Sequence, residues 1–428
     1  MRSMTKLAVF TAAALATAMM ISGVAWAAPE FTYHGQFRIN YYMDSRSDTS
    51  TFGDDNVAAH RLRWRPTFDV KVSDTVAMHT QFNIGHIRDG FGNHQTNQNG
   101  DPAFGLRHAL IQAQLADGVT GVAGIVPVSD KFGDTLFSGD WDFNPITLAF
   151  IIAPSDGVSV RLGAAKLLEG SEMKSGDEDD VDAYVGDVDF GPFGASVYYI
   201  VGAKGAATGE FTHTSYGVRY ADKLGDIALN AFVLGATLDS KAGDYKSSGF
   251  AGKAEAKIPV GDMNVGVMVV YASGDKKFGE AKSSASAFIT PMSLIGHHGY
   301  WGYTGKLNIQ GPTDTGIDDP VNIDGGSYSN ANLGRGLTTV QANISAPLSD
   351  KLGLYAAVGW FQSNDAPSGS SKDIGTDVYV QGKYNLGESL NLEFGVDYAA
   401  LGAGSHMTVA ADKTRSITTV FSRLQLEY

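Results

Sequence analysis

The feature that most constrains the fold is the way the connections between short amphipathic segments alternate in length. Tight turns rich in Asp, Gly, Pro and Ser join pairs of segments directly, at 72–75, 116–118, 154–157, 190–194, 221–226, 259–262, 347–351 and 385–389. Longer and more polar connections separate these hairpins, at 44–57, 89–103, 128–146, 169–180, 204–210, 239–247, 276–334, 363–372 and 402–413. A β-sandwich has no reason to sort its connections this way. A transmembrane β-barrel does, because short turns emerge on one side of the membrane and long loops on the other.

The segments between the turns have the two-residue period of β-strands. In HRLRWRPTFDVKV (60–72), Arg61, Arg63 and Arg65 fall on one face, while Leu62 and Trp64 fall on the other. Such a strand suits a soluble sheet with a polar outer face. It equally suits a barrel whose apolar face meets lipid and whose polar face lines water. The alternating connections favour the barrel.

Counting strands from the turns predicts the size of this barrel. Eight tight turns join sixteen strands, and one further strand stands at each end, at 31–43 and 414–428. We therefore expect an all-β, transmembrane, antiparallel up-and-down barrel of about eighteen strands, with both termini on the short-turn side. Sixteen strands remain the alternative if one hairpin is misassigned, and 285–310 could add a pair.

The N-terminal segment has the form of a secretory signal peptide. Residues 1–27 begin with Arg2 and Lys6, continue with an apolar stretch, and end in a small-x-small pattern at Ala27. A retained membrane anchor is the alternative, but the apolar stretch is short and its end resembles a cleavage site. We expect residues 28–428 to form one barrel domain.

Composition excludes several classes of protein. The chain has no Cys, so no disulfide framework or thiol chemistry is available, and its charged fraction of 18% lies below the roughly 25% of soluble domains. Removing residues 1–27 leaves 30 basic side chains against 46 acidic ones, a formal charge of −16, which argues against a nucleic-acid partner. No Ser-His-acid set, phosphate loop or zinc motif has usable spacing. We expect no enzyme activity, no cofactor and no metal.

The last strand carries the most specific signal. SITTVFSRLQLEY ends on Tyr428, with Leu426 and Leu424 alternating back from it, and it resembles the assembly signal of outer-membrane β-barrel proteins. From the signal peptide to this residue the chain resembles the general diffusion porins of Gram-negative bacteria. The resemblance implies a water-filled channel in the cell outer membrane for passive diffusion of small hydrophilic solutes and ions. It also implies a homotrimer in contact with membrane lipid and lipopolysaccharide, assembled by the barrel-assembly machinery.

The same resemblance implies a long third loop that folds into the barrel and narrows it. That loop is the connection 128–145, between predicted strands at 118–127 and 146–154. Its aromatic residues indicate that it packs against something. Porins of this type place acidic residues of the loop opposite a basic cluster on the wall, which makes the charged residues of this loop candidates for the constriction: Asp130, Lys131, Asp134, Asp140 and Asp142.

The arginine-rich strand is the natural opposing wall. We expect Arg61, Arg63 and Arg65 to line the lumen, because arginine stays charged at any relevant pH and orders water and anions with its planar fork. Further candidates are Arg38, Lys71, Arg161 and Arg219. In the alternative, the arginines sit at the extracellular rim and bind lipopolysaccharide phosphates, and the loop is simply an acidic surface loop.

Three other functions remain open at this level. A barrel could enclose a partner such as a haem protein, and it could carry a catalytic site at its outer rim. A secreted soluble all-β protein is the third and simplest alternative. Segment 276–334 could cap the mouth or latch a neighbouring subunit.

Overall fold

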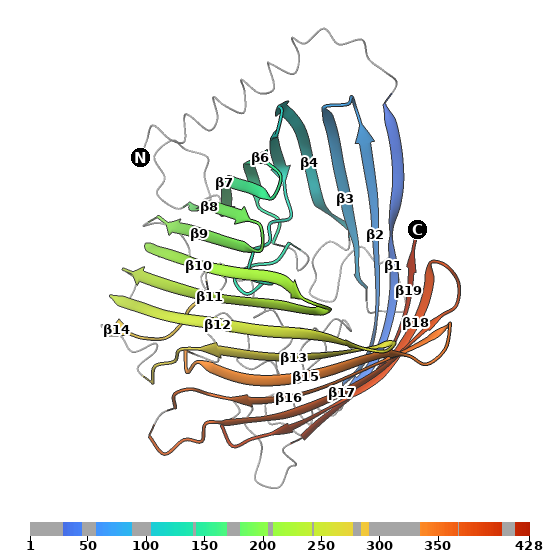
Figure 1. Cartoon of the computed structure of the whole chain (residues 1–428), viewed down its shortest axis with the longest axis vertical. Helices are drawn as coiled ribbons and strands as arrows, with labels where there is room; N and C mark the ends of the chain where they lie inside the picture. Colours follow the sequence, from blue (N-terminus) through green and yellow to red (C-terminus); the bar gives the residue numbers. More distant parts are fainter. Residues whose placement is uncertain are drawn as a thin grey trace.

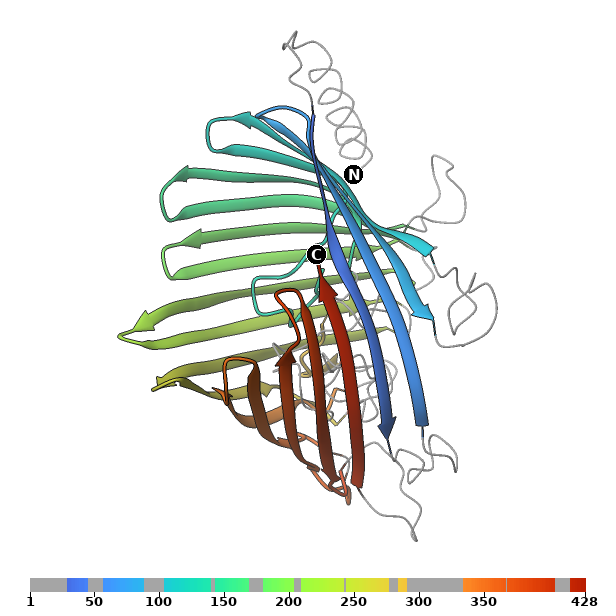
Figure 2. The same ribbon diagram turned by 90° about the vertical axis from the view of Figure 1, so that its right-hand side faces the viewer.

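The computed structural model describes residues 29–44, 57–87, 104–139, 143–168, 180–203, 209–241, 244–276, 284–290, 334–366, 368–404 and 416–428. In this part of the chain, eighteen strands form one closed barrel in which each strand is antiparallel to the next (Figures 1 and 2). The barrel closes because the first strand pairs with the last, with Phe37 opposite Leu426 and Ile39 opposite Leu424. The predicted fold class and the count of eighteen barrel strands are confirmed.

The strands of the first half are β1 (Glu30–Asp44), β2 (Val57–Lys71), β3 (Val76–Ile87), β4 (Phe104–Ala116), β5 (Val119–Ile125), β6 (Ile146–Ser155), β7 (Val158–Leu168), β8 (Val181–Phe190) and β9 (Phe193–Gly202). Those of the second half are β10 (Phe211–Leu224), β11 (Ile227–Ser240), β12 (Tyr245–Val260), β13 (Met263–Ala272), β15 (Leu337–Pro347), β16 (Leu352–Gln362), β17 (Asp373–Asn385), β18 (Leu390–Leu401) and β19 (Ser416–Glu427). A two-residue segment, β14 (Ser284–Ala285), pairs in parallel with β12 and adds no strand to the wall. Of the range 285–310, for which an extra pair of strands was the alternative, residues 285–290 are described and add no strand to the wall. Residues 291–310 lie outside the described residues.

Side chains alternate between an apolar outer face and an inner face, as a two-residue period requires. On β9 and β11, Val197 and Val233 are more than half exposed, while their neighbours Tyr198, Phe232 and Leu234 are buried. A continuous apolar surface on the outside of a closed barrel suits lipid, and closure satisfies the backbone hydrogen bonds that lipid cannot.

The C-terminal residue completes the seam of the barrel. Gly35 and Tyr428 exchange two backbone hydrogen bonds, with N–O distances of 2.8 and 3.1 Å. The phenol of Tyr428 accepts a hydrogen bond from Trp64 Nε1 at 2.7 Å and lies 2.9 Å from the hydroxyl of Tyr33. The Tyr33 ring packs on Phe68 at 5.1 Å between ring centroids. This aromatic cluster identifies the Trp64 and Phe68 side of β2 as its outer face. Whether Tyr428, Leu426 and Leu424 act as an assembly signal stays a prediction.

The predicted signal peptide lies outside the described residues. Within the described part of the chain, no helix is both long enough and apolar enough to span a bilayer.

Candidate channel constriction

The connection between β5 and β6, residues 126–145, folds into the barrel (Figure 1). We call it the constriction loop; all of it except 140–142 is described. The rings of Phe132 and Phe137 pack on Tyr198 of β9, with centroid distances of 6.2 and 5.0 Å. Phe132 also reaches Phe232 of β11, at 5.7 Å. Because Tyr198 and Phe232 face inward, the loop runs across the inside of the wall from β6 to β11. The predicted inward fold of the third loop is confirmed.

Asp130 shapes this loop from within. Its side chain is 6% exposed and accepts three backbone N–H groups of the loop, from Phe132, Leu136 and Phe137, at 2.6, 2.5 and 3.0 Å. Burial raises the pKa of this carboxyl to about 7, while the three N–H donors oppose that rise. Asp134 takes a left-handed backbone conformation at the turn of the loop, with φ of 60°. Asp130 therefore holds the loop's shape, and its carboxylate oxygens are turned toward the loop's own backbone.

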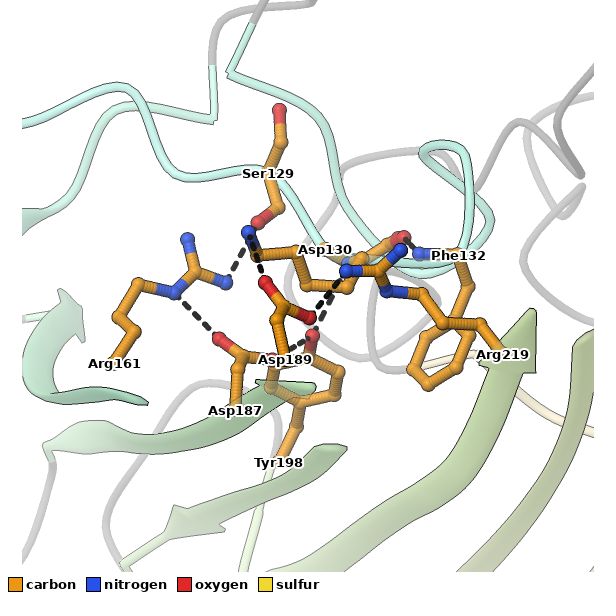
Figure 3. A network of polar contacts seen from close by, with 9 residues as sticks. Ser129, Asp130, Phe132, Arg161, Asp187, Asp189, Tyr198 and Arg219 are labelled. Atoms are coloured by element: carbon orange, nitrogen blue, oxygen red, sulfur yellow. Dashed lines mark hydrogen bonds and ion pairs between the residues drawn. The ribbon is translucent and has the colours of Figure 1, made fainter. Parts of the chain in front are cut away.

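A polar network ties the loop to the wall at Asp187 of β8 (Figure 3). Arg161 on β7 donates from Nε to Asp187 Oδ2 at 2.5 Å and from Nη2 to the carbonyl oxygen of Ser129 in the loop at 3.0 Å. The Tyr198 hydroxyl donates to Asp187 Oδ1 at 2.6 Å and accepts from the backbone N–H of Lys131 at 3.2 Å. A buried carboxylate thus orients one cation and one phenol, and each of these groups contacts the loop backbone.

A second ion-pair group lies beside the first. Asp189 receives the Lys131 ammonium from the loop, with Nζ to Oδ2 at 3.3 Å, and the Arg219 guanidinium from β10. In the sheet register, Gly194 of β9 stands between Asp189 and Arg219. A Cβ on Gly194 would lie 2.7 Å from Arg219 Nε and 2.8 Å from Asp189 Oδ1. Glycine is therefore needed here so that the arginine can cross β9 and reach the carboxylate.

Arg107 on β4 holds the other end of the loop. Its Nη2 donates to the carbonyl oxygen of Gly139 at 2.9 Å, and its Nη1 donates to Gln81 Oε1 on β3 at 2.6 Å. The register of β3 and β4 shifts between Gln81 and Phe82, so an extra residue enters β4 at this point. The irregularity leaves two consecutive side chains, Arg107 and His108, buried on the inside of the barrel.

A second segment, residues 284–290, also lies inside the barrel. Phe288 is fully buried. Ser247 of β12 donates to the carbonyl oxygen of Ala287 at 2.7 Å. His213 Nε2 of β10 lies 3.0 Å from the carbonyl oxygen of Ile289; because that oxygen can only accept, Nε2 carries the proton. Residues 284–290 of the segment 276–334 therefore pack on the inside of the wall, near the long-loop ends of β10 and β12; residues 277–283 and 291–333 lie outside the described residues.

The arginine-rich strand β2 stands half a turn away from β11 in the ring of eighteen strands, although one end of the constriction loop reaches β4. Arg38, Arg63 and Arg65 face inward, opposite the outer face defined by Trp64 and Phe68. Their side chains bridge neighbouring strands through amide oxygens. These contacts are Arg38 Nε to Gln425 at 2.9 Å, Arg63 Nη2 to Gln36 at 2.6 Å and Arg65 Nε to Asn83 at 3.0 Å.

The remaining predicted site residues are placed as follows. Arg61 pairs through its backbone with Asn40, but its side chain lies outside the described residues, as do Asp140 and Asp142. Lys71 stands at the short-turn end of β2, 2.8 Å from Asp74 and 3.9 Å from Glu30, well away from Arg63. Pore lining by each of these residues stays a prediction.

The sequence pattern missed several residues that hold the constriction loop. Asp187 and Asp189 alternate within GDVDF (186–190), so a search for an acidic partner of Arg161 would have found them. Tyr198 resembles any other aromatic residue of a strand. Arg107 was hidden because the bulge in β4 breaks the alternation by which inward residues are recognised.

Comparisons with known proteins show which solved structures share this fold. No model of a protein family matches the chain, and no curated protein matches it. Among solved structures, Pseudomonas aeruginosa OpdK with vanillate aligns with a TM-score of 0.57 and 10% identity, over 93% of this chain and 98% of that one. P. aeruginosa OccK8 (OprE) aligns with a TM-score of 0.55 and 12% identity, over 93% and 98% of the two chains. A BenF-like porin from Pseudomonas fluorescens Pf-5 gives a TM-score of 0.56 and 12% identity, over 93% and 99%. The chain therefore has the fold of these bacterial porins along nearly its whole length.

Proposed function

We propose that this chain is a porin of the Gram-negative outer membrane and that it forms a water-filled channel for passive diffusion of small hydrophilic solutes. The observation that carries the proposal is a closed barrel with an apolar outer face and two segments, 126–145 and 284–290, folded inside it. A barrel narrowed from within admits solutes by size and charge. The likeness to porin structures over 93% of the chain supports the same conclusion.

Within that function, we propose that small anions are the preferred solutes, carboxylates among them. Arg38, Arg63, Arg65 and Arg107 are carried by β1, β2 and β4 on the inside of the barrel, and a guanidinium matches a carboxylate through two parallel N–H donors. The formal charge of the whole chain does not oppose this, because selectivity is set at the constriction. The likeness to the structure of OpdK with vanillate, an aromatic carboxylate, supports this proposal.

The two inward segments also bear on the competing functions. A sheath around a partner protein needs an open interior, whereas here 126–145 and 284–290 pack on the inner wall from β6 to β13. A rim-site enzyme is disfavoured by the comparisons, since the matched structures are porins. Assembly as a homotrimer through the barrel-assembly machinery, in contact with lipopolysaccharide, belongs to the proposal as well.

Planar-bilayer recording of the purified barrel tests the proposal. We expect stepwise, ohmic insertions, and a reversal potential in a salt gradient that indicates anion preference. Neutralising two inward arginines, Arg63→Gln with Arg65→Gln, should shift the reversal potential toward cations. The matched control removes two lysines at the short-turn end, Lys223→Gln with Lys351→Gln. Well-folded barrels that never conduct would overturn the channel, and an equal shift in both variants would overturn the role of the arginines.

A further inference from the structure

A row of four side chains crosses β1 to β4 on the inside of the barrel. His34 Nε2 lies 2.7 Å from Asp69 Oδ2, and His79 Nδ1 lies 2.7 Å from Asp69 Oδ1. His79 Nε2 then lies 3.4 Å from His108 Nδ1, with the two rings 5.5 Å apart. Each strand contributes one residue, so one carboxylate is clamped between two imidazoles and the second imidazole contacts a third.

The row is open to water at one end and closed at the other. The side chains of His34 and Asp69 are 47% and 41% exposed, and that of His79 is 29% exposed, whereas His108 is buried. Asp69 shares the inner face of β2 with Arg65, and Thr67, which accepts a hydrogen bond from Gln81 at 2.9 Å, stands between them. Protons and ions in the lumen can therefore reach the clamped carboxylate.

The charged groups around the row come from every neighbouring strand. Arg65 and Arg107 act electrostatically on His108, and Asn144 of the constriction loop lies beside it. At the short-turn end, Lys71 is matched by Asp74 and Glu30. On the β19 side, Gln36 separates His34 from Glu427, with Gln36 Nε2 3.5 Å from Glu427 Oε1. Of the side-chain types in and around the row, histidine is the one whose charge ordinarily changes between pH 5 and 8.

We propose that the row His34–Asp69–His79–His108 is a second specificity-determining site, which makes the ion preference of the channel depend on pH. With both histidines on Asp69 neutral, these three side chains together carry one negative charge; with both protonated, they carry one positive charge. A reversal of sign on the lumen wall, in water and within a Debye length of the permeating ion, changes which ion the wall attracts. This inference rests on the proposed function, because it describes the selectivity of the same pore.

The test is the reversal potential in a KCl gradient at pH 8, 6.5 and 5. The anion-to-cation permeability ratio should rise by about twofold or more from pH 8 to pH 5. His34→Gln with His79→Gln should remove most of that rise, because glutamine stays neutral across the interval. Asp69→Asn should raise anion preference already at pH 8, since it removes the negative charge. Asp226→Asn, in the turn between β10 and β11, is the matched carboxylate control and should leave both values unchanged.

The outcomes separate the two proposals. Barrels that fold but do not conduct would overturn the proposed function. Conducting barrels whose permeability ratio is flat between pH 8 and 5, or rises equally in the double histidine variant, would overturn only the row. If the double variant does not insert, His34→Gln alone is measured. Its histidine is the more exposed of the two, and the pH-dependent rise should then fall to about half.

Discussion

The inner face of this barrel differs between its two sides: it is polar on one side and apolar on the other. On the arginine side, β1 to β4, inward residues are polar and hold one another across strands, as Arg63 does with Gln36 and Arg65 with Asn83. On the loop side, β7 to β13, inward residues include Phe232, Leu234 and Val270, which are buried although they point into the barrel. An apolar inner face is stable only when something covers it.

What covers the loop side is the chain itself. The constriction loop contributes Phe132, Leu136 and Phe137 to the same buried cluster as Phe232 and Leu234, and Phe288 of the second inward segment joins it. The comparison teaches that strands apolar on both faces are a sign of internal cover in a barrel of this kind. The lumen then lies toward the polar side, where the arginines and the histidine row stand.

The largest effect should come from removing the carboxylate that ties the loop to its wall. Asp187→Ala leaves the Arg161 guanidinium without this carboxylate and frees the Tyr198 hydroxyl. Loss of one partner of a buried pair costs about 3–5 kcal/mol. We expect a loosened loop, seen as a higher and noisier single-channel conductance. Asp226→Ala in a short turn is the control. A conductance trace identical to wild type would show that the aromatic contacts alone hold the loop.

A single substitution at Gly249 should displace the second inward segment, residues 284–290. A Cβ on Gly249 would lie 2.3 Å from the backbone nitrogen of Phe288. Gly249→Val should therefore push 284–290 off the wall at a cost of about 1–3 kcal/mol. Hydrogen exchange of the backbone amides in 284–290 should become faster. Gly353→Val, where nothing lies within 4 Å, is the matched control. Unchanged hydrogen exchange in the Gly249 variant would mean that the segment has a second stable position on the wall.

A smaller effect is expected at Gly194. Gly194→Ala should separate the Arg219 guanidinium from Asp189 and leave the carboxylate to Lys131 alone. Because only one of two cations on a partly exposed carboxylate is lost, the free energy of unfolding of the barrel should fall by about 1 kcal/mol or less. The midpoint of denaturant unfolding measures this, with Gly353→Ala as control. A shift no larger than that of the control would show that Arg219 reaches Asp189 by another path.

The most local effect should be the pH dependence of the loop itself. The pKa of Asp130 is raised to about 7 in the fold from an ordinary value of 3.8. Its contribution to holding the loop is therefore complete below about pH 4 and is lost as the pH rises through 7. Amide exchange in 130–137, corrected for its intrinsic pH dependence, should become faster from pH 5 to pH 8 as the Asp130 carboxyl ionises. Asp130→Asn should abolish the change; a persistent change in that variant would assign it to another group.

Prediction from sequence succeeded where the signal was periodic. The run Arg61, Arg63, Arg65 against Leu62 and Trp64 placed β2 and its two faces, because a strand's side chains alternate whatever surrounds it. The contact between Arg219 and Asp189 could not be predicted, since it depends on Gly194 and on the register of three strands. His34, Asp69, His79 and His108 are scattered along the chain and meet only because β1 to β4 pair in one particular register.

Sequence alone therefore predicted the barrel, its closure and a strand number of about eighteen, and the resemblance to porins added the inward-folded third loop. Alternation and connection length are local properties, so they can be read from the sequence without knowing which strands are neighbours in the sheet. Only the tertiary structure decided which inward side chains meet. The bulge that turns Arg107 and His108 inward, the cover of the loop side by 284–290 and the clamp on Asp69 depend on register across strands. A register shift of one residue would send the same side chains to opposite faces of the wall.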